Sequence, residues 1–286
     1  MSAYLPVLPK LMVDEAVKAA LLEDWGRAGD ITSQATIPAD KGATAIIASR
    51  KPGVLAGLEL AESAFRQTDS DVQFESLSAD GDRLEQGTIV ARMSGPARAI
   101  LSAERVALNY LSHLSGIASA TAQFADLIAH TKADIVCTRK TTPGLRAFEK
   151  YAVRCGGGSN HRFGLDDAIL IKDNHIAVAG GVRQAIEAAK AFAGHLVKIE
   201  VEVDTLDQLR EALPLTPDVV MLDNMGPDLL REAVRIAGGQ VLLEASGGIE
   251  ADTVKNIAEA GVDLISSGWI THSAPILDLG LDIEIG

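Results

Sequence analysis

Charged or glycine residues stand at the ends of six apolar segments in the second half of the chain. They are Arg139 and Lys140, Lys172, Glu202, Asp223, Ser246 with Gly247 and Gly248, and Gly268. Each residue alone could be a cap or a salt-bridge partner. Together they favour a site, because an apolar strand gains nothing from ending in a buried charge and active sites of α/β barrels gather at the carboxyl ends of the strands.

Four basic side chains suit a small molecule with two negative charges: Arg139, His161, Arg162 and Lys172. A charge-assisted hydrogen bond returns only about 1.5–3 kcal/mol, so two buried carboxylates need several donors, and planar guanidinium groups fit them best. Residues 139–172 include seven Lys or Arg and three Asp or Glu, a balance of +4 in a chain of net charge -13. Because these charges interrupt glycine-rich turns, we favour an anion pocket over a solvated helix face.

Two acidic residues, Glu202 and Asp223, end neighbouring segments. Their carboxylates could hold Mg²⁺ or accept the hydroxyl groups of a ribose. They could also stabilise positive charge that develops on a sugar carbon. A pair of acids is equally typical of a glycosidase, but glycosides carry no charge for the nearby cations to bind.

Glycines close the last two apolar segments, Leu242–Gly248 and Ile265–Gly268. Backbone N–H groups at such positions can bind a phosphate, as the late strands of α/β barrels often do. A tight turn is the alternative interpretation of the doubled glycine.

Alternating strand and helix patterns must position these residues. The expected strands are Ile135–Thr138, Ala168–Lys172, Lys198–Val203, Val219–Asp223, Val241–Ala245 and Leu264–Ser267, and the helical segments between them are Val182–Phe192, Thr205–Leu213, Asp228–Ala237 and Ala251–Ala260. This rhythm predicts βαβ units and a parallel sheet. The steps between the last four site positions are 21, 23 and 22 residues, which favours a barrel, although six strands fall short of the eight in a full (β/α)₈ barrel.

The first third of the chain indicates a mixed α/β domain. We expect Asp14 to cap a helix that runs to about Asp24, and residues 101–129 to form two helices with a break near Gly116. Short strands are expected at Ala43–Ser49, Val72–Leu77 and Thr88–Met93. The C-terminal stretch from Leu277 to Ile285 alternates apolar and polar residues, which predicts a half-buried strand that returns to the sheet of the first domain.

Composition narrows the function class. The net charge of -13 argues against partners such as nucleic acid or an anionic membrane surface. Cys137 and Cys155 fit no zinc or redox motif, the start of the chain does not read as a signal peptide, and no apolar run approaches the ~20 residues of a membrane span. We therefore expect a cytoplasmic protein.

Several segments make the chain resemble the quinolinate phosphoribosyltransferase family, also called carboxylating nicotinate-nucleotide pyrophosphorylase. The most specific are TRKTTPGLR at Thr138–Arg146, RCGGGSNHRFG at Arg154–Gly164 and ILIKDNH at Ile169–His175; the others are LLEDWGRAGDITS at Leu21–Ser33, SAER at Ser102–Arg105, IEVEV at Ile199–Val203, VMLDN at Val220–Asn224 and LEASGG at Leu243–Gly248. A molybdenum-associated subfamily lacks the KDNH segment that stands here at Lys172–His175, so it is set aside.

The resemblance implies an α/β fold: an N-terminal α/β sandwich-like domain at 1–112, an incomplete, open six-stranded α/β barrel at 113–273, and a C-terminal strand at 274–286 that completes the first domain. It also implies a homodimer, or a higher oligomer built from it, with active sites shared across the interface. On the SAER segment, Arg105 would be the arginine that enters the partner's site.

The resemblance further implies the reaction: transfer of the phosphoribosyl group of phosphoribosyl pyrophosphate to quinolinate, with decarboxylation, in NAD biosynthesis. Arg105, Arg139, His161, Arg162 and Lys172 would bind quinolinate. Lys140, Glu202 and Asp223 would act on the sugar donor and its Mg²⁺, with Glu202 chosen over Glu200 because Glu200 should point to the opposite face or layer. Ser246, Gly247, Gly248, Gly268 and His272 would surround the 5-phosphate.

Three other functions remain in competition. A phosphoribosyltransferase acting on a monocarboxylate such as nicotinate would need fewer cations than are present. A Schiff-base aldolase would use Lys140 or Lys172 as nucleophile. A non-catalytic anion-binding protein would have no use for the pair formed by Glu202 and Asp223.

Overall fold

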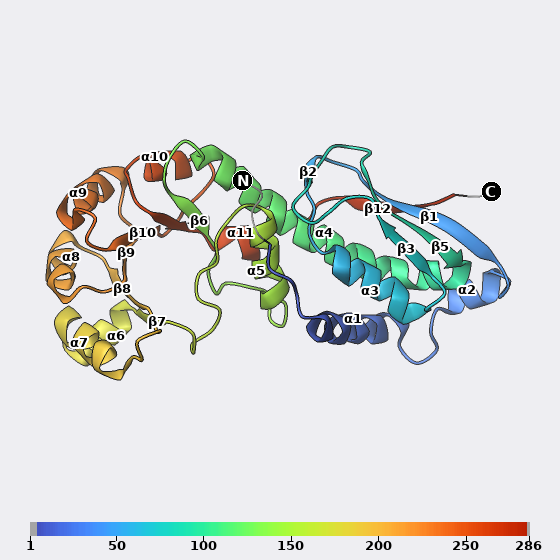
Figure 1. The fold of residues 1–286 in the computed structure, drawn as a ribbon, viewed down its shortest axis with the longest axis horizontal. Helices are drawn as coiled ribbons and strands as arrows, with labels where there is room; N and C mark the ends of the chain where they lie inside the picture. The colour runs from blue at the N-terminus through green and yellow to red at the C-terminus, as the bar shows by residue number, and fades with distance from the viewer. Residues whose placement is uncertain (1–4, 285–286) are drawn as a thin grey trace. The chain divides into compact units, whose positions relative to one another are not determined.

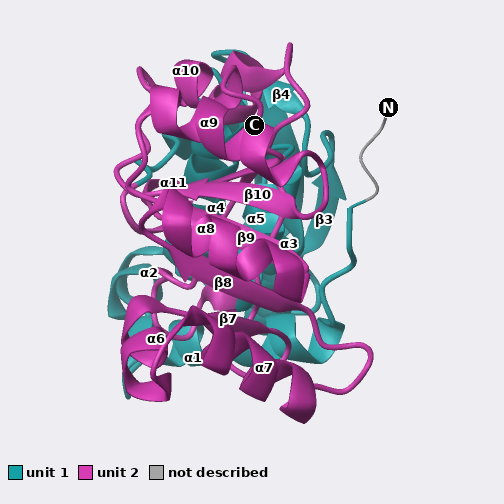
Figure 2. Ribbon diagram, turned by 90° about the vertical axis from the view of Figure 1, so that its left-hand side faces the viewer, with its two compact units in different colours: residues 1–122, 147–157, 274–286 teal, residues 123–146, 158–273 magenta. Residues whose placement is uncertain are grey.

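The computed structural model describes residues 5–284, and the chain forms two compact units (Figure 2). Residues up to 122, residues 147–157 and residues from 274 onward belong to the first unit; residues 123–146 and 158–273 form the second. The domain limits expected after residues 112 and 273 stay a prediction. A domain is a part of the chain that can fold alone, and a compact unit need not do so.

A four-stranded antiparallel sheet, in the order β12–β1–β5–β3, forms the centre of the first unit. Its strands are β1 (Gly42–Ser49), β3 (Gln73–Ser76), β5 (Ile89–Pro96) and β12 (Leu279–Glu284), and a separate pair consists of β2 (Gly53–Val54) and β4 (Arg83–Leu84). Leu281 of β12 lies opposite Ile47 of β1. The return of the C-terminal strand to the first domain is therefore confirmed, while Ile285 lies outside the described residues.

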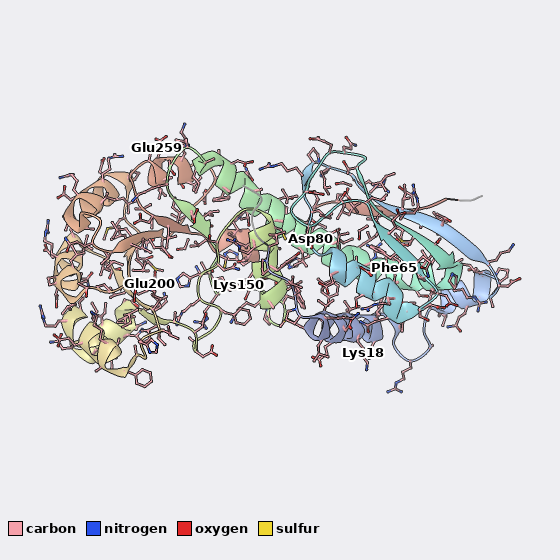
Figure 3. The ribbon with its side chains drawn as sticks, viewed as in Figure 1. Lys18, Phe65, Asp80, Lys150, Glu200 and Glu259 are labelled. Atoms are coloured by element: carbon pink, nitrogen blue, oxygen red, sulfur yellow. The ribbon has the colours of Figure 1, made fainter. Side chains whose placement is uncertain are left out.

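The other main elements of this unit are helices. They are α1 (Lys10–Trp25), α2 (Ile31–Thr36), α3 (Leu58–Thr68), α4 (Ala97–Ile128, which continues into the second unit) and α5 (Arg146–Cys155). Phe65 of α3 is fully buried and its ring lies 5.7 Å from that of Phe74 on β3, so α3 packs directly on the sheet (Figure 3).

The expected start of the first helix was wrong. Helix α1 begins at Lys10, directly after Pro9, whose fixed φ suits a helix start. Asp14 therefore lies inside the helix, where its Oδ1 accepts hydrogen bonds of 2.7 Å from Ser63 and from Arg66 of α3. Its carboxylate joins two helices instead of capping one.

The expected break near Gly116 was also wrong, since α4 is one helix of 32 residues. A β-carbon at Gly116 would lie 2.3 Å from the carbonyl oxygen of Pro275. The glycine allows the C-terminal segment to cross close to the helix, and it does so without interrupting the backbone.

The second unit is an open α/β barrel, as expected. Its six parallel strands lie in the order β6–β11–β10–β9–β8–β7, and β6 does not pair with β7. The strands are β6 (Asp134–Val136), β7 (Ile169–Ile171), β8 (Ile199–Val203), β9 (Val219–Asp223), β10 (Leu242–Ser246) and β11 (Leu264–Ser266).

Helices follow the strands and line the outer side of the arc that β7 to β10 form in Figure 1. They are α6 (Asp173–Ala179), α7 (Val182–Phe192), α8 (Leu206–Ala212) with the short 3-10 turn η1 (Leu213–Leu215), α9 (Pro227–Ala237), α10 (Val254–Ala258) and α11 (Trp269–His272). Within residues 5–284, none of the helices has the length and apolarity needed to cross a bilayer.

Candidate active site

A pocket of about 770 Å³ lies at the carboxyl ends of the six barrel strands, and all of its lining residues belong to the second unit. Ordinary ligand sites measure roughly 300–1,000 Å³. Twelve of the thirteen expected site residues line it: Arg139, Lys140, His161, Arg162, Lys172, Glu202, Asp223, Ser246, Gly247, Gly248, Gly268 and His272. The thirteenth, Arg105, lies on α4 in the first unit, with its side chain 63% exposed.

Strand geometry explains how the sequence collects these side chains. Neighbouring residues of a strand face opposite sides of the sheet, and the lining residues of β9 and β10 are two apart. Asp223 is paired with Ser246, and Met221 is paired with both Glu202 and Glu244. One face of the sheet thus carries the pocket while the other packs against helices.

Two guanidinium groups form a cationic side of the pocket. Arg162 Nη1 donates to the carbonyl oxygen of Ala168 at 3.1 Å. The Nε atoms of Arg139 and Arg162 are buried and have no hydrogen-bond partner among the described residues. The pKa of Arg162 is lowered, first by burial and then by the positive charge of Arg139. An anion between the two groups would relieve this repulsion and satisfy the buried donors.

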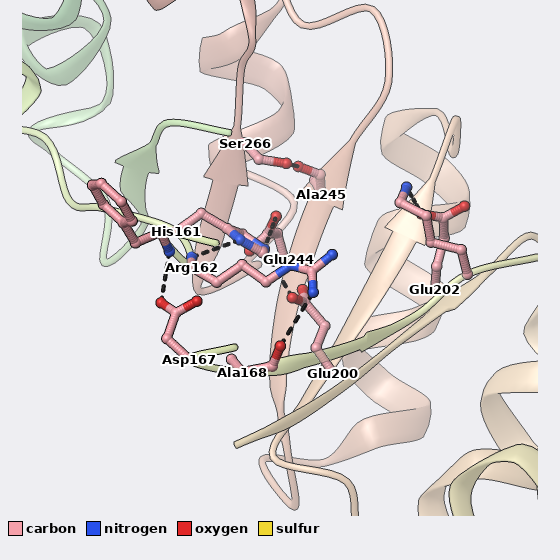
Figure 4. A network of polar contacts seen from close by, with 11 residues as sticks. His161, Arg162, Asp167, Ala168, Glu200, Glu202, Glu244, Ala245 and Ser266 are labelled. Carbon is pink, nitrogen blue, oxygen red and sulfur yellow. Dashed lines mark hydrogen bonds and ion pairs between the residues drawn. The ribbon is translucent and has the colours of Figure 1, made fainter. Parts of the chain in front are cut away.

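His161 is held from both sides of its ring. Its Nδ1 accepts a hydrogen bond from the backbone N–H of Arg162 at 2.8 Å, and its Nε2 lies 2.8 Å from an oxygen of Glu200 (Figure 4). This pattern corresponds to a ring that carries its proton on Nε2 and donates it to Glu200. The ring is therefore fixed in orientation before any ligand arrives.

A second carboxyl group, that of Glu244, lies close to His161. Its Oε1 is 3.9 Å from His161 Nε2, and its side chain is 2% exposed (Figure 4). Burial, followed by the negative charge of Glu200, raises the pKa of Glu244 to about 7, although His161 and the Ser266 hydroxyl act in the opposite direction. The carboxyl group of Glu244 thus retains its proton far more readily than an ordinary glutamic acid.

The acidic side of the pocket lies on β8 and β9. Glu202 is nearly buried and accepts a hydrogen bond of 2.7 Å from Lys172 Nζ, whose side chain is half exposed. Asp223 Oδ2 accepts one of 2.5 Å from the side chain of Asn224. Glu200 and Glu202 are two residues apart, so their side chains lie on the same face of β8 but at different heights along the strand. Glu200 is hydrogen-bonded to His161, whereas Glu202 is hydrogen-bonded to Lys172.

Glycines shape the turns after the last two strands. Gly247 has φ +97, and a β-carbon there would lie 2.1 Å from Asn224 Oδ1. A β-carbon at Gly268 would lie 2.7 Å from Cδ of Lys140 and 3.2 Å from the ring of His272. These two glycines therefore let Asn224, Lys140 and His272 approach the backbone closely.

The expectation from sequence omitted ten of the residues that line the pocket, among them Glu244, Asn224 and Trp269. For Glu244 a signal was available, because it is a charged residue inside an apolar strand and stands two positions before Ser246, on the same face. Asn224 follows Asp223 directly after β9, and Trp269 follows Gly268 as the first residue of α11.

Comparison with known proteins gives matches along almost the whole chain. Two family models match, "Quinolinate phosphoribosyl transferase, N-terminal domain" over residues 30–115 and "Quinolinate phosphoribosyl transferase, C-terminal domain" over residues 117–282. A "Probable nicotinate-nucleotide pyrophosphorylase [carboxylating]" of Bacillus subtilis is 43% identical over 275 residues, which cover 96% of this chain and 94% of that protein.

Two further relatives agree with these matches. A "Nicotinate-nucleotide pyrophosphorylase [carboxylating]" of Mycobacterium leprae is 43% identical over 274 residues, covering 94% of this chain and 96% of that protein. The solved structure of the nicotinate-nucleotide pyrophosphorylase from Francisella tularensis has a TM-score of 0.94 at 41% identity, covering 97% of this chain and 98% of that one.

Proposed function

Because this chain belongs to the quinolinate phosphoribosyltransferase family, we propose that it catalyses the reaction for which the family is named. The phosphoribosyl group of phosphoribosyl pyrophosphate passes to quinolinate, and the products are nicotinate mononucleotide, pyrophosphate and CO₂, a step of NAD biosynthesis. One observation carries the proposal: a cationic side and an acidic side face the same pocket at the ends of the barrel strands.

The cationic side binds quinolinate. Arg139 and Arg162 bring buried, unsatisfied donors, and each guanidinium group can form two parallel hydrogen bonds to a carboxylate. Lys172 adds a positive charge that is already balanced by Glu202 in the absence of ligand. His161, held by Glu200 and by the backbone N–H of Arg162, limits the orientation of the pyridine ring.

The acidic side receives the sugar donor. Glu202 and Asp223 lie on neighbouring strands and offer carboxylate oxygens, the donors that Mg²⁺ prefers, so they fit a site for this ion that also includes substrate phosphates. When bound, Mg²⁺ would neutralise the charge of the leaving pyrophosphate. Lys140 packs against Gly268, and its ammonium group would bind the same phosphates.

The turns after β10 and β11 hold the 5-phosphate of the ribose. Ser246, Gly247 and Gly248 offer a hydroxyl and backbone N–H groups in one turn, and Gly268 with His272 completes the site from the next strand. Late barrel strands commonly bind phosphate in this way.

The reaction follows from this arrangement. With the ribose fixed by its phosphate and the pyridine fixed by its carboxylates, the ring nitrogen attacks C1 of the ribose as pyrophosphate leaves. Glu202 and Asp223 stabilise the positive charge that develops on the sugar carbon. The resulting pyridinium then loses the carboxylate next to its nitrogen as CO₂.

The working enzyme is a homodimer in which Arg105 completes the partner's site. Among residues 5–284, its exposed guanidinium forms only a long contact of 3.9 Å, with the neighbouring Glu104, so it is available to another chain. We place the enzyme in the cytoplasm, because Cys137 and Cys155 are both buried thiols, the state expected in a reducing compartment.

The test is incubation with quinolinate labelled in its 2-carboxyl group, phosphoribosyl pyrophosphate and Mg²⁺, while released CO₂ is counted. Release that needs both substrates supports the proposal. No release from quinolinate, together with consumption of nicotinate, would favour the monocarboxylate enzyme. A covalent adduct trapped by borohydride on Lys140 or Lys172 would favour the aldolase.

A further inference from the structure

Glu244 is a buried carboxyl group in the pocket for which the proposed reaction has assigned no role. We infer that Glu244 is the acid that protonates C2 of the pyridine ring as CO₂ leaves. The inference rests on the proposed function, because it concerns the second chemical step of that reaction.

The geometry places this carboxyl group at the floor of the cationic side. Glu244 lines the same pocket as Arg139 and Arg162, its side chain is 2% exposed, and its Oε1 has no hydrogen-bond partner among the described residues. Nε2 of His161 lies 3.9 Å from this oxygen. A polar atom so deeply buried is costly unless a ligand or a proton satisfies it.

Glu244 faces one other carboxyl group and two further polar groups. Glu200 projects from β8, His161 from the segment that precedes β7, and Ser266 from β11. The ligand atoms of Glu200, Glu244 and His161 lie within 4.8 Å of one another. Two buried carboxylates this close do not both ionise readily, and the raised pKa of Glu244 agrees with a proton stored on it.

A divalent cation could in principle occupy the same three side chains. Two observations favour a proton. His161 Nε2 and Glu200 already form a 2.8 Å hydrogen bond, which a metal would have to replace. Arg162, a permanent cation, also lies within electrostatic range of Glu200.

The chemical step is balanced with this proton. The bond between C2 and its carboxylate breaks, CO₂ leaves, and the electron pair stays on C2 next to the pyridinium nitrogen. The Glu244 carboxyl proton bonds to this electron pair in the same step, so that CO₂ departs as the new C–H bond forms. The Glu244 carboxylate then regains a proton from solvent as nicotinate mononucleotide leaves. A neutral carboxyl group is suited to this place, because it can lie beside the substrate carboxylate without repelling it.

The experiment is a single-turnover measurement on the full-length enzyme, with pyrophosphate and CO₂ followed in the same reaction. Glu244→Gln keeps the shape of a protonated carboxyl group but has no acidic proton. Glu187→Gln, on the exposed face of α7, is the matched control. General acid catalysis contributes roughly 10²–10⁴-fold, so in Glu244→Gln we expect CO₂ release to slow about 100-fold while pyrophosphate release changes little. Quinolinate mononucleotide should accumulate.

The wild-type enzyme gives an independent readout if the variant does not fold. Its CO₂ release should slow, relative to its pyrophosphate release, as the pH rises above about 7 and Glu244 loses its proton. Two results would overturn the inference. One is release of pyrophosphate and CO₂ at the same rate in Glu244→Gln. The other is release of pyrophosphate and CO₂ at the same rate in the wild type at every pH between about 6 and about 9. Absence of pyrophosphate release from the wild type would instead contradict the proposed function.

Discussion

Replacement of Arg139 by Ala should separate the binding of the two substrates. Arg139 Nε is buried without a hydrogen-bond partner among the described residues, and the charge of Arg139 lowers the pKa of Arg162. Arg139 therefore contributes repulsion and an unsatisfied donor to the fold. Its benefit must come from a ligand.

The expected magnitude follows from the hydrogen bonds that quinolinate would lose. Arg139 can donate two charge-assisted bonds to one carboxylate, at about 1.5–3 kcal/mol each. Because Arg162 remains and water can enter the gap, we expect a net loss of about 3 kcal/mol, which is roughly two orders of magnitude in Kd. Arg139→Lys keeps the charge but not the planar fork, so its loss should be smaller.

The assay is calorimetric titration of each variant with quinolinate and, separately, with phosphoribosyl pyrophosphate and Mg²⁺, combined with thermal unfolding. Quinolinate binding should weaken about 100-fold, binding of the sugar donor should change by less than about threefold, and Tm should not fall. Equal losses for the two ligands would refute the assignment of Arg139 to quinolinate. A large drop in Tm would show that Arg139 stabilises the fold instead.

Four other outcomes are expected. Mixing Arg105→Ala with Lys172→Ala subunits should restore part of the activity, since a mixed dimer holds one intact site; proven mixed dimers without recovery would contradict a shared site. Gly247→Ala should cost about 1–3 kcal/mol of unfolding free energy and raise the KM for the sugar donor, because its β-carbon would clash with Asn224, whereas Gly248→Ala, which meets no atom within 4 Å, should be milder in thermal melts. Folding raises the pKa of Glu244 from 4.5 to about 7, so between these pH values the folded state holds a proton that the unfolded state releases. The free energy of unfolding should therefore fall by up to about 3 kcal/mol as the pH rises through that window. Urea titrations at several pH values should show this fall in the wild type and not in Glu244→Gln. Removal of Mg²⁺ by a chelator should abolish turnover but leave quinolinate binding intact, and a loss of quinolinate binding in calorimetry would place the ion on the wrong substrate.

The repeating part of the fold was predictable from the sequence because its signals are local. Each barrel strand is an apolar run, each is followed by an amphipathic helix, and the polar residue that ends each run marks the carboxyl edge. That edge is where the pocket lies, so strand order was not needed to find Lys172, Glu202 and Asp223.

What the sequence did not reveal depends on contacts between distant segments. Gly116 looks like a helix break, yet its role is to let Pro275 cross α4. Asp14 looks like a cap, yet its partners lie about fifty residues away on α3. Arg105 could be assigned only through the family resemblance, because nothing in its local pattern distinguishes it from a solvent-exposed helix residue.

Glu244 was missed for a different reason. A glutamate inside an apolar strand is a signal of a special position, but the role of Glu244 becomes visible only when β8 brings Glu200 and the segment before β7 brings His161 close to it. Strand pairing places Met221 opposite both Glu244 and Glu202. A single sequence does not reveal which residues of neighbouring strands lie opposite each other.

A crystal structure of the enzyme with quinolinate tests the central claim most directly. The account predicts one quinolinate in the barrel pocket, with its carboxylates against Arg139 and Arg162 and its ring nitrogen turned toward Glu202 and Asp223. Quinolinate bound elsewhere, or bound with its carboxylates beside the acidic pair, would contradict the account.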